Sequence, residues 1–179
     1  TDKDKVYETV LLLGKQTDTQ DISGEVLKEA DASKLSEETV KDVIMEFMGD
    51  YSQIPPMYSA LKVNGKKLYE LAREGKTVER KAREVKIYEI EILETSLPRV
   101  KMRVRCSKGT YIRTLCHDIG ERLGVGGCME ELLRTKVERF EAAGSKTLSE
   151  IEAAVTEGRM SELLVPVDEM FDQYQKVTI

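Results

Sequence analysis

The chain has 179 residues, 40% of them hydrophobic, and a net charge of −5 at pH 7, a size that supports one buried core and would be crowded for two. Its three cysteines lack the paired spacing of a metal site and are too few for a disulfide framework, and no apolar run is long enough to cross a bilayer. These features exclude membrane-spanning and disulfide-stabilised classes. They predict buried, reduced thiols in a cytoplasmic protein without a signal peptide.

The charge is unevenly distributed along the chain. Residues 1–50 carry a net charge of −7 and residues 114–179 carry −6, whereas residues 51–113 carry +8. Binding to a phosphate backbone requires local positive charge, because released counterions supply most of the nonspecific affinity. A solvated charged surface explains the same distribution, and charge alone does not decide between the two.

The first third of the chain predicts a strand, a loop and a helix. Residues 6–13 are apolar on both faces, which predicts a strand in the interior of a sheet. Residues 14–24 form a polar loop, in which hydrogen bonding within the loop accounts for the aspartates. Ser36 then caps a helix with acidic residues in its first turn, and Gly49 ends it.

An Asn-Gly pair at residues 64–65 predicts a hairpin, followed by a short helix over residues 68–73. Three lysines and two tyrosines come together around this hairpin. They are Lys62, Lys66, Lys67, Tyr58 and Tyr69. Such a cluster suits RNA, through phosphate contact and base stacking, and an exposed charged hairpin tip fits the local sequence about equally well.

The second half predicts a strand pair, a helix and a further strand. Residues 85–93 change apolar phase between Ile87 and Tyr88, which predicts a bulge, and they should pair antiparallel with residues 100–106. Residues 112–123 have helical spacing, residues 133–140 form another strand, and a capping box at residues 147–150 opens a last helix. Strands and helices without regular alternation predict an α+β fold with a mixed, largely antiparallel sheet flanked by helices.

The junction at residues 107–110 is a tight strand-to-helix turn, in which Thr110 is the expected helix cap. Tyr111 and Arg113 follow it, off the apolar stripe. An arginine at this end opposes the helix dipole, so helix stability does not explain Arg113. A surface arginine beside a rim tyrosine remains the simpler interpretation of the local sequence.

Four segments carry recognisable motifs. They are Lys5-Val6-Tyr7 with the loop from Leu13 to Gly24, Gln53 to Lys62 with Gly65 to Gly75, Lys108 to Leu115, and Leu132-Leu133-Arg134-Thr135. In this order they resemble the motifs of the bacterial tRNA pseudouridine-55 synthases, the TruB family. The resemblance implies the pseudouridine synthase catalytic-domain fold, in incomplete form.

The resemblance also implies an isomerase that converts uridine-55 in the T-loop of tRNA to pseudouridine after the base has left its stack. Arg113 would pair with the catalytic aspartate and keep it ionised. Tyr7 would pack on the flipped base and take part in proton transfer, Tyr111 and Leu132 would line the pocket, and Asp21 would lie near the substrate. The lysines expected at the RNA backbone are Lys62, Lys66, Lys67 and Lys108.

One family motif does not occur in the chain. In the family the nucleophile is an aspartate in a Gly-x-Leu-Asp-Pro-type motif, and no such motif occurs in these 179 residues. Residues 1–179 are therefore expected to form a single partial catalytic domain that lacks the nucleophile segment and the carboxyl-terminal RNA-binding domain, and to be inactive alone.

Without the resemblance, Tyr7 is an ordinary strand tyrosine and Leu132 a core residue. His117 is expected on the helix surface, hydrogen-bonded to Asp118 or Glu121. No metal or cofactor is expected, because there is no ligand cluster or glycine-rich phosphate loop, and Asp18 and Asp21 lack calcium-loop spacing. A noncatalytic RNA-binding or RNA-folding module and a structural interaction domain remain alternatives.

Overall fold

The computed structural model describes residues 4–137, 140–141, 145–159 and 163. Contacts divide the chain into two units, residues 1–142 and 143–179, and the second contains only one described helix. The strands are β1 (Lys5–Leu13), β2 (Lys15–Thr17), β3 (Val26–Glu29), β4 (Gly49–Gln53), β5 (Lys62–Val63), β6 (Lys66–Lys67), β7 (Arg83–Ser96), β8 (Arg99–Cys106), β9 (Gly127–Val137) and β10 (Phe140–Glu141). The helices are α1 (Glu37–Met45), α2 (Leu68–Arg73), α3 (Ile112–Arg122) and, in the second unit, α4 (Leu148–Thr156).

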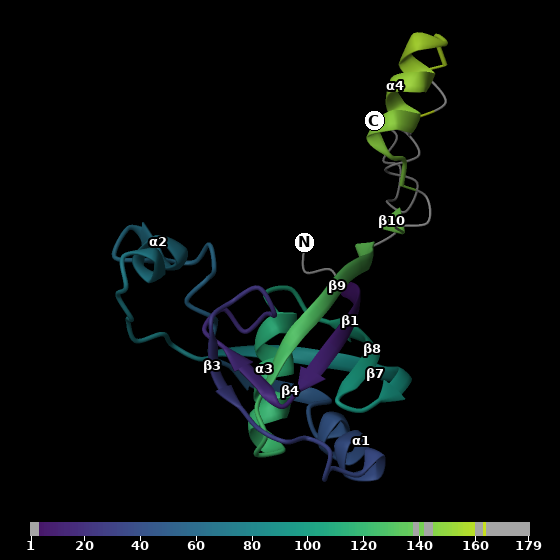
Figure 1. Ribbon diagram of the computed structural model, residues 1–179. Helices are drawn as coiled ribbons and strands as arrows, with labels where there is room; N and C mark the ends of the chain where they lie inside the picture. Colours follow the sequence, from purple (N-terminus) through teal and green to yellow (C-terminus); the bar gives the residue numbers. More distant parts are fainter. Residues whose placement is uncertain (1–3, 138–139, 142–144, 160–162, 164–179) are drawn as a thin grey trace, which may run out of the picture. The chain divides into compact units, whose positions relative to one another are not determined.

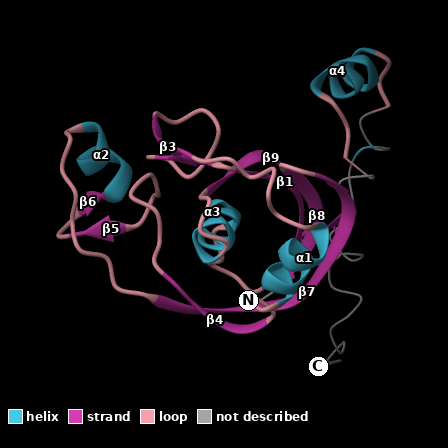
Figure 2. Cartoon of the chain, turned by 60° about the horizontal axis from the view of Figure 1, so that its bottom comes forward, coloured by secondary structure: helices cyan, strands magenta, loops and turns pink. Residues whose placement is uncertain are grey.

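The first unit is built on a six-stranded sheet in the order β10-β9-β1-β8-β7-β4, and every pair of neighbouring strands is antiparallel. Figures 1 and 2 show that the sheet curves around α3, with α1 on the same side. The α+β class and the interior position of β1 are confirmed. No helix in the described ranges is long and apolar enough to span a membrane.

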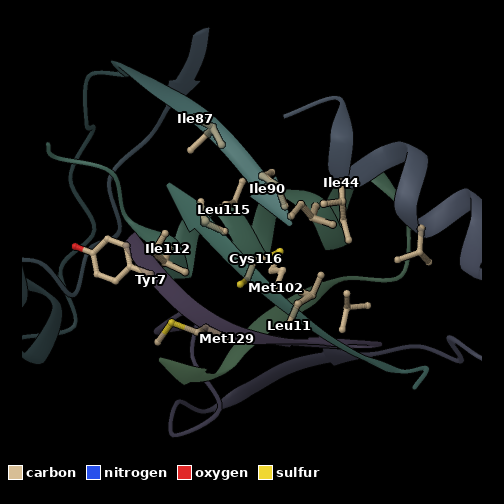
Figure 3. Packing of buried hydrophobic residues seen from close by; sticks show 14 of the residues in the cluster. Tyr7, Leu11, Ile44, Ile87, Ile90, Met102, Ile112, Leu115, Cys116 and Met129 are labelled. Atoms are coloured by element: carbon tan, nitrogen blue, oxygen red, sulfur yellow. The ribbon is translucent and has the colours of Figure 1, made fainter. Parts of the chain in front are cut away.

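The core lies between α3 and the concave face of the sheet (Figure 3). The apolar stripe of α3 is buried, as its spacing predicts, and it packs against alternate residues of the two central strands. The fully buried members include Leu11, Val100, Met102, Val104, Leu115, Cys116 and Ile119. Each large aliphatic side chain buried in this way contributes roughly 1.5–3 kcal/mol.

All three cysteines are free and buried, as predicted. Burial raises the pKa of Cys106 to about 11 and that of Cys116 to about 12, so both thiols stay protonated at neutral pH. They therefore act as small apolar core residues.

Several local predictions are confirmed. The side chain of Ser36 caps α1 by accepting a hydrogen bond of 3.1 Å from Thr39 N. The β7–β8 register shifts between Ile87 and Glu89, where the apolar phase changes, and shifts again between Ile92 and Glu94. The hairpin turn has the positive φ angles, 51° and 83°, that an Asn-Gly pair adopts readily.

Some element boundaries were wrong. The helix α1 ends at Met45, and Gly49 instead begins β4, an edge strand without apolar alternation that pairs with β7. Part of the expected polar loop pairs as β2 with β3, and β9 begins at Gly127 rather than at residue 133. In these places long-range pairing outweighs local propensity. In α4 only Ala154 of the expected inward stripe is buried, while Ile151 and Val155 are exposed.

Candidate active site

The turn between β8 and α3 places the side chains of the strongest motif. Gly109 adopts a φ of 88°, which favours glycine. The prediction that Thr110 caps α3 was wrong, because its hydroxyl donates 2.9 Å to Ser107 O and the capping position is Tyr111. The main chain of Tyr111 is held instead by Gln53 of β4, whose Oε1 accepts from Tyr111 N at 2.8 Å and whose Nε2 donates to Tyr111 O at 3.0 Å.

Arg113 projects from the first turn of α3 and connects two other segments. Its Nη2 donates to Tyr58 O at 2.7 Å and its Nη1 to Thr19 O at 3.4 Å. No carboxylate in the described part of the chain forms an ion pair with Arg113. The guanidinium is thus fixed by neutral main-chain carbonyls, and no described carboxylate offsets its charge.

The loop that meets Arg113 is itself docked on the sheet. Ile22 N donates to Met129 O at 2.9 Å, and Met129 N donates to Gln20 O at 3.0 Å. The side chain of Gln20 also accepts 2.7 Å from the hydroxyl of Thr114 in α3. Asp21, two residues after Thr19, uses its carboxylate within the loop, where it accepts from Ser23 N at 2.9 Å and from Ser23 Oγ at 2.5 Å.

Tyr7 lies on β1 and is 6% exposed. It pairs across the sheet with Arg134 of β9, whose guanidinium carbon lies 5.1 Å from the Tyr7 ring centroid. Burial raises the pKa of Tyr7, and the charge of Arg134 beside it opposes that shift. Figure 3 shows Tyr7 beside Ile112, at the edge of the core, with its hydroxyl pointing away from the other labelled side chains. Because Ile112 directly precedes Arg113, Tyr7 of β1 lies beside the end of α3 that carries Arg113.

Leu132 is 46% exposed on β9, so its assignment to the core from the local sequence was wrong. It lies opposite Thr9, two residues along from the Tyr7–Arg134 pair. Directly opposed residues share a face of the sheet, so Leu132 is on the face that carries Tyr7. The structure thus gathers Tyr7, Tyr111 and Arg113 around the start of α3, with Leu132 on the adjoining part of the sheet and Asp21 in the loop whose Thr19 O meets Arg113.

The hairpin lysines come together, as predicted, and α2 and the hairpin protrude from the sheet (Figure 2). Lys67 donates 3.1 Å to the hydroxyl of Tyr69, and Lys66 approaches Glu74 at 3.7 Å. Lys108 is exposed on a different element, the turn before α3.

A cavity of about 320 Å³ adjoins the hairpin, and four of its lining side chains are basic. They are Lys62, Arg80, Lys81 and Arg83. Arg80 Nη1 donates 3.1 Å to Pro55 O, and its buried Nε has no hydrogen-bond partner among the described residues. With Glu79 as the one acidic residue among its lining side chains, this cavity carries an excess of positive charge.

Three arginines on β8 in the middle segment form ion pairs with carboxylates. Arg103 contacts Glu8 at 2.8 Å and Glu91 at 2.6 Å, while Arg105 contacts Asp4 at 3.2 Å. Arg99 binds Glu130 through two nitrogens. The excess positive charge of residues 51–113 consequently belongs to the hairpin and its cavity more than to the sheet.

The prediction that His117 is hydrogen-bonded to Asp118 or Glu121 was wrong. Its Nδ1 is buried without a hydrogen-bond partner in the described ranges, because Asp118 instead accepts a short hydrogen bond from the hydroxyl of Tyr51 in β4. Burial raises the pKa of Asp118, and the bond from Tyr51 opposes that shift. The described residues contain no group of three or more His, Cys, Asp or Glu side chains arranged to hold a metal ion.

Comparison with known proteins assigns the chain to a family. Residues 1–112 match the family model for the amino-terminal domain of the TruB family pseudouridylate synthases. The chain belongs to the TruB family. Residues 113–172 match the model of the tRNA pseudouridylate synthase B C-terminal domain.

Curated members of the TruB family align with nearly the whole chain. The tRNA pseudouridine synthase B of Clostridium tetani is 48% identical over 98% of this chain and 59% of its own length, and that of Ralstonia pickettii is 49% identical over 99% and 57%. The chain therefore spans about three-fifths of the length of these relatives.

Solved structures share the fold. The crystal structure of a Cbf5-Nop10-Gar1 complex matches 90% of this chain and 39% of that chain, with a TM-score of 0.64 and 29% identity. The structure of an H/ACA RNP bound to a substrate RNA containing 2'-deoxyuridine matches 90% and 37%, with a TM-score of 0.59 and 25% identity.

Two side chains at the candidate site, Gln53 and Arg134, have no role predicted from the sequence. Gln53 and Arg134 both lie inside motifs that resemble the family, which was the available signal. Their contacts join positions 58 or more residues apart, namely Gln53 with Tyr111 and Arg134 with Tyr7. Local periodicity carries no information about such pairs.

Proposed function

We propose that this chain forms the greater part of the catalytic domain of a tRNA pseudouridine synthase that isomerises uridine-55 in the T-arm of tRNA. The observation that carries the proposal is Arg113, a guanidinium fixed by two carbonyls at the start of α3 with no carboxylate partner among the described residues. Family membership supports this activity, and the named relatives are tRNA pseudouridine synthases.

The reaction breaks the N-glycosidic bond, turns the base and rejoins it through carbon, and an ionised aspartate is the nucleophile in the family. A guanidinium that pairs with this carboxylate lowers the pKa of the aspartate and fixes the orientation of the carboxylate oxygens. Since the 179 residues contain no Gly-x-Leu-Asp-Pro motif, we assign the aspartate to a segment outside them.

The remaining side chains form the pocket for the flipped uracil. Tyr7 packs against the base and takes part in proton transfer, and Tyr111 and Leu132 enclose it. Asp21 approaches the nucleotide from the loop that Arg113 touches through Thr19. Base flipping exposes both faces of the uracil, so aromatic and apolar walls of this kind offset part of the lost stacking.

The RNA partner is held through its phosphates by Lys62, Lys66, Lys67 and Lys108, and a tRNA substrate fits a cytoplasmic location. Replacing the three hairpin lysines by alanine should weaken tRNA binding roughly tenfold or more at moderate salt, because each phosphate contact releases about one counterion. The slope of log Kd against log salt, measured by filter binding, should fall by about two to three. The matched control replaces Arg99, Arg103 and Arg105, which have carboxylate partners; an equal loss in both triple variants would contradict the assignment.

Tritium release from tRNA labelled at carbon 5 of uridine tests the activity. The 179-residue chain alone should release none, because it lacks the nucleophile. The full-length gene product that contains this chain should release about one equivalent per tRNA and leave pseudouridine at position 55. Release by the isolated chain would refute the placement of the aspartate, and tRNA binding by the full-length product without release would favour a noncatalytic RNA-binding module.

A further inference from the structure

Gln53 is the one fully buried amide side chain in the described part of the core, with 1% of its surface exposed. It ends the edge strand β4, and its side chain faces the start of α3. Its Oε1 accepts from Tyr111 N at 2.8 Å, and its Nε2 donates to Tyr111 O at 3.0 Å. The amide thus pairs with both main-chain groups of a single residue, as a neighbouring strand would.

Core packing does not explain a glutamine at this position. An apolar side chain would fill the same space without the cost of burying an amide, which is about 1–3 kcal/mol when no partner compensates it. Among side chains of this length only glutamine offers an acceptor and a donor on one planar group without taking up a proton. The residue type therefore matches the main chain of Tyr111 specifically.

Gln53 is also part of a wider connection between β4 and α3. Tyr51, two residues earlier on the same face of β4, donates to Asp118 in the middle of α3. Five residues after Gln53, Tyr58 O accepts the 2.7 Å hydrogen bond from Arg113. One short segment, residues 53–58, thus holds the main chain before Arg113 and the guanidinium itself.

We propose that Gln53 is a positioning residue for the pseudouridine synthase site, one that sets Tyr111 and Arg113 by clamping the main chain at the start of α3. It acts through these residues and does not touch the substrate. The inference rests on the proposed function, because positioning has a consequence for kcat only if Arg113 serves the reaction. Displacing a catalytic group by about 1 Å costs on the order of 100-fold in rate.

Two substitutions in the full-length gene product separate positioning from general stability. Gln53→Met keeps the volume and removes both hydrogen bonds, so kcat should fall about 10- to 100-fold while KM changes less than about threefold. Gln53→Glu keeps the shape, and the introduced carboxyl can donate to Tyr111 O only when it is protonated. Its pKa should be raised by burial, with Tyr51 and Asp118 as the neighbouring titratable groups and His117 beside Asp118.

The expected signature of Gln53→Glu is a dependence on pH that the other variants lack. The kcat of Gln53→Glu should be near that of the unsubstituted protein at pH 6 and at least about tenfold lower at pH 8.5. Once the introduced carboxyl is deprotonated, its oxygen faces Tyr111 O with no hydrogen between them, and the two oxygens repel each other. Dividing the kcat of the variant by that of the unsubstituted protein at each pH cancels any effect of His117 that the two proteins share. The matched control is Ser52→Asp, which adds the same charge on the exposed face of β4 and should keep the ratio flat.

Hydrogen exchange of the peptide that covers residues 107–113 tests the clamp independently of activity. Protection of the Tyr111 amide should fall in Gln53→Met, and in Gln53→Glu at pH 8.5 relative to the unsubstituted protein at the same pH. A kcat within about twofold in Gln53→Met, or a flat pH ratio in Gln53→Glu, would overturn the inference. If the full-length product itself is inactive, the proposed function fails while the exchange result still decides whether the clamp exists.

Discussion

In the full-length gene product, Arg113→Lys should lower kcat by roughly 10²–10³-fold, the usual effect of removing one preorganised electrostatic partner. Lysine keeps the positive charge but has a single nitrogen. It cannot donate to Tyr58 O and Thr19 O and also meet a carboxylate with two parallel hydrogen bonds. Steady-state tritium release measures the change, and binding of tRNA should be nearly unaffected.

Arg122→Lys is the matched control for this substitution. Arg122 ends the same helix, is 65% exposed and forms a surface ion pair with Glu46 at 3.0 Å. Such pairs contribute little to stability, so kcat should stay within about twofold. Equal kinetic effects of the two lysine substitutions would show that Arg113 acts only through the stability of α3.

Gly120→Ala should lower the free energy of unfolding by about 3 kcal/mol or more, the upper range for overpacking a core. A Cβ atom at Gly120 would lie 2.1 Å from Gly127 N and 2.2 Å from the carbonyl carbon of Gly126, both main-chain atoms that cannot rotate away. Helix propensity alone predicts the opposite sign, a gain of about 1 kcal/mol for alanine over glycine. Urea denaturation of the full-length product measures which effect dominates.

Glu121→Ala provides the control one residue along α3. Its side chain is exposed and does not enter the contact with residues 126–127, so its free energy of unfolding should change by less than about 0.5 kcal/mol. A neutral Gly120→Ala would mean that α3 does not pack on the start of β9 as closely as described. The position of Arg113 relative to Tyr7 would then lose its structural basis.

The parts of the fold that the sequence predicted well depend on local patterns. The interior strand β1 follows from apolar residues on both faces, the start of α1 from the side chain of Ser36, and the bulge at Tyr88 from a change of apolar phase. The strand β4 has no such pattern. It is a strand because its main chain pairs with β7 and because Tyr51 and Gln53 find polar partners on α3.

The candidate site was located by resemblance rather than by local chemistry. Nothing in the spacing of Tyr7 or Leu132 distinguishes them from structural residues, and only the fold brings Tyr7 and Arg113 to one end of α3. Gln53 and Arg134 were missed because their roles consist of contacts between distant segments. The roles of the site residues themselves remain predictions.

A crystal structure of the full-length gene product tests the central claim most directly, through the distance between the Arg113 guanidinium and the nearest aspartate. We predict two hydrogen bonds of about 3 Å from Arg113 to an aspartate outside these 179 residues, facing a cleft bordered by Tyr7 and Leu132. An Arg113 that has no carboxylate within ion-pair distance in the complete protein, or that lies away from Tyr7 and Leu132, would contradict the account.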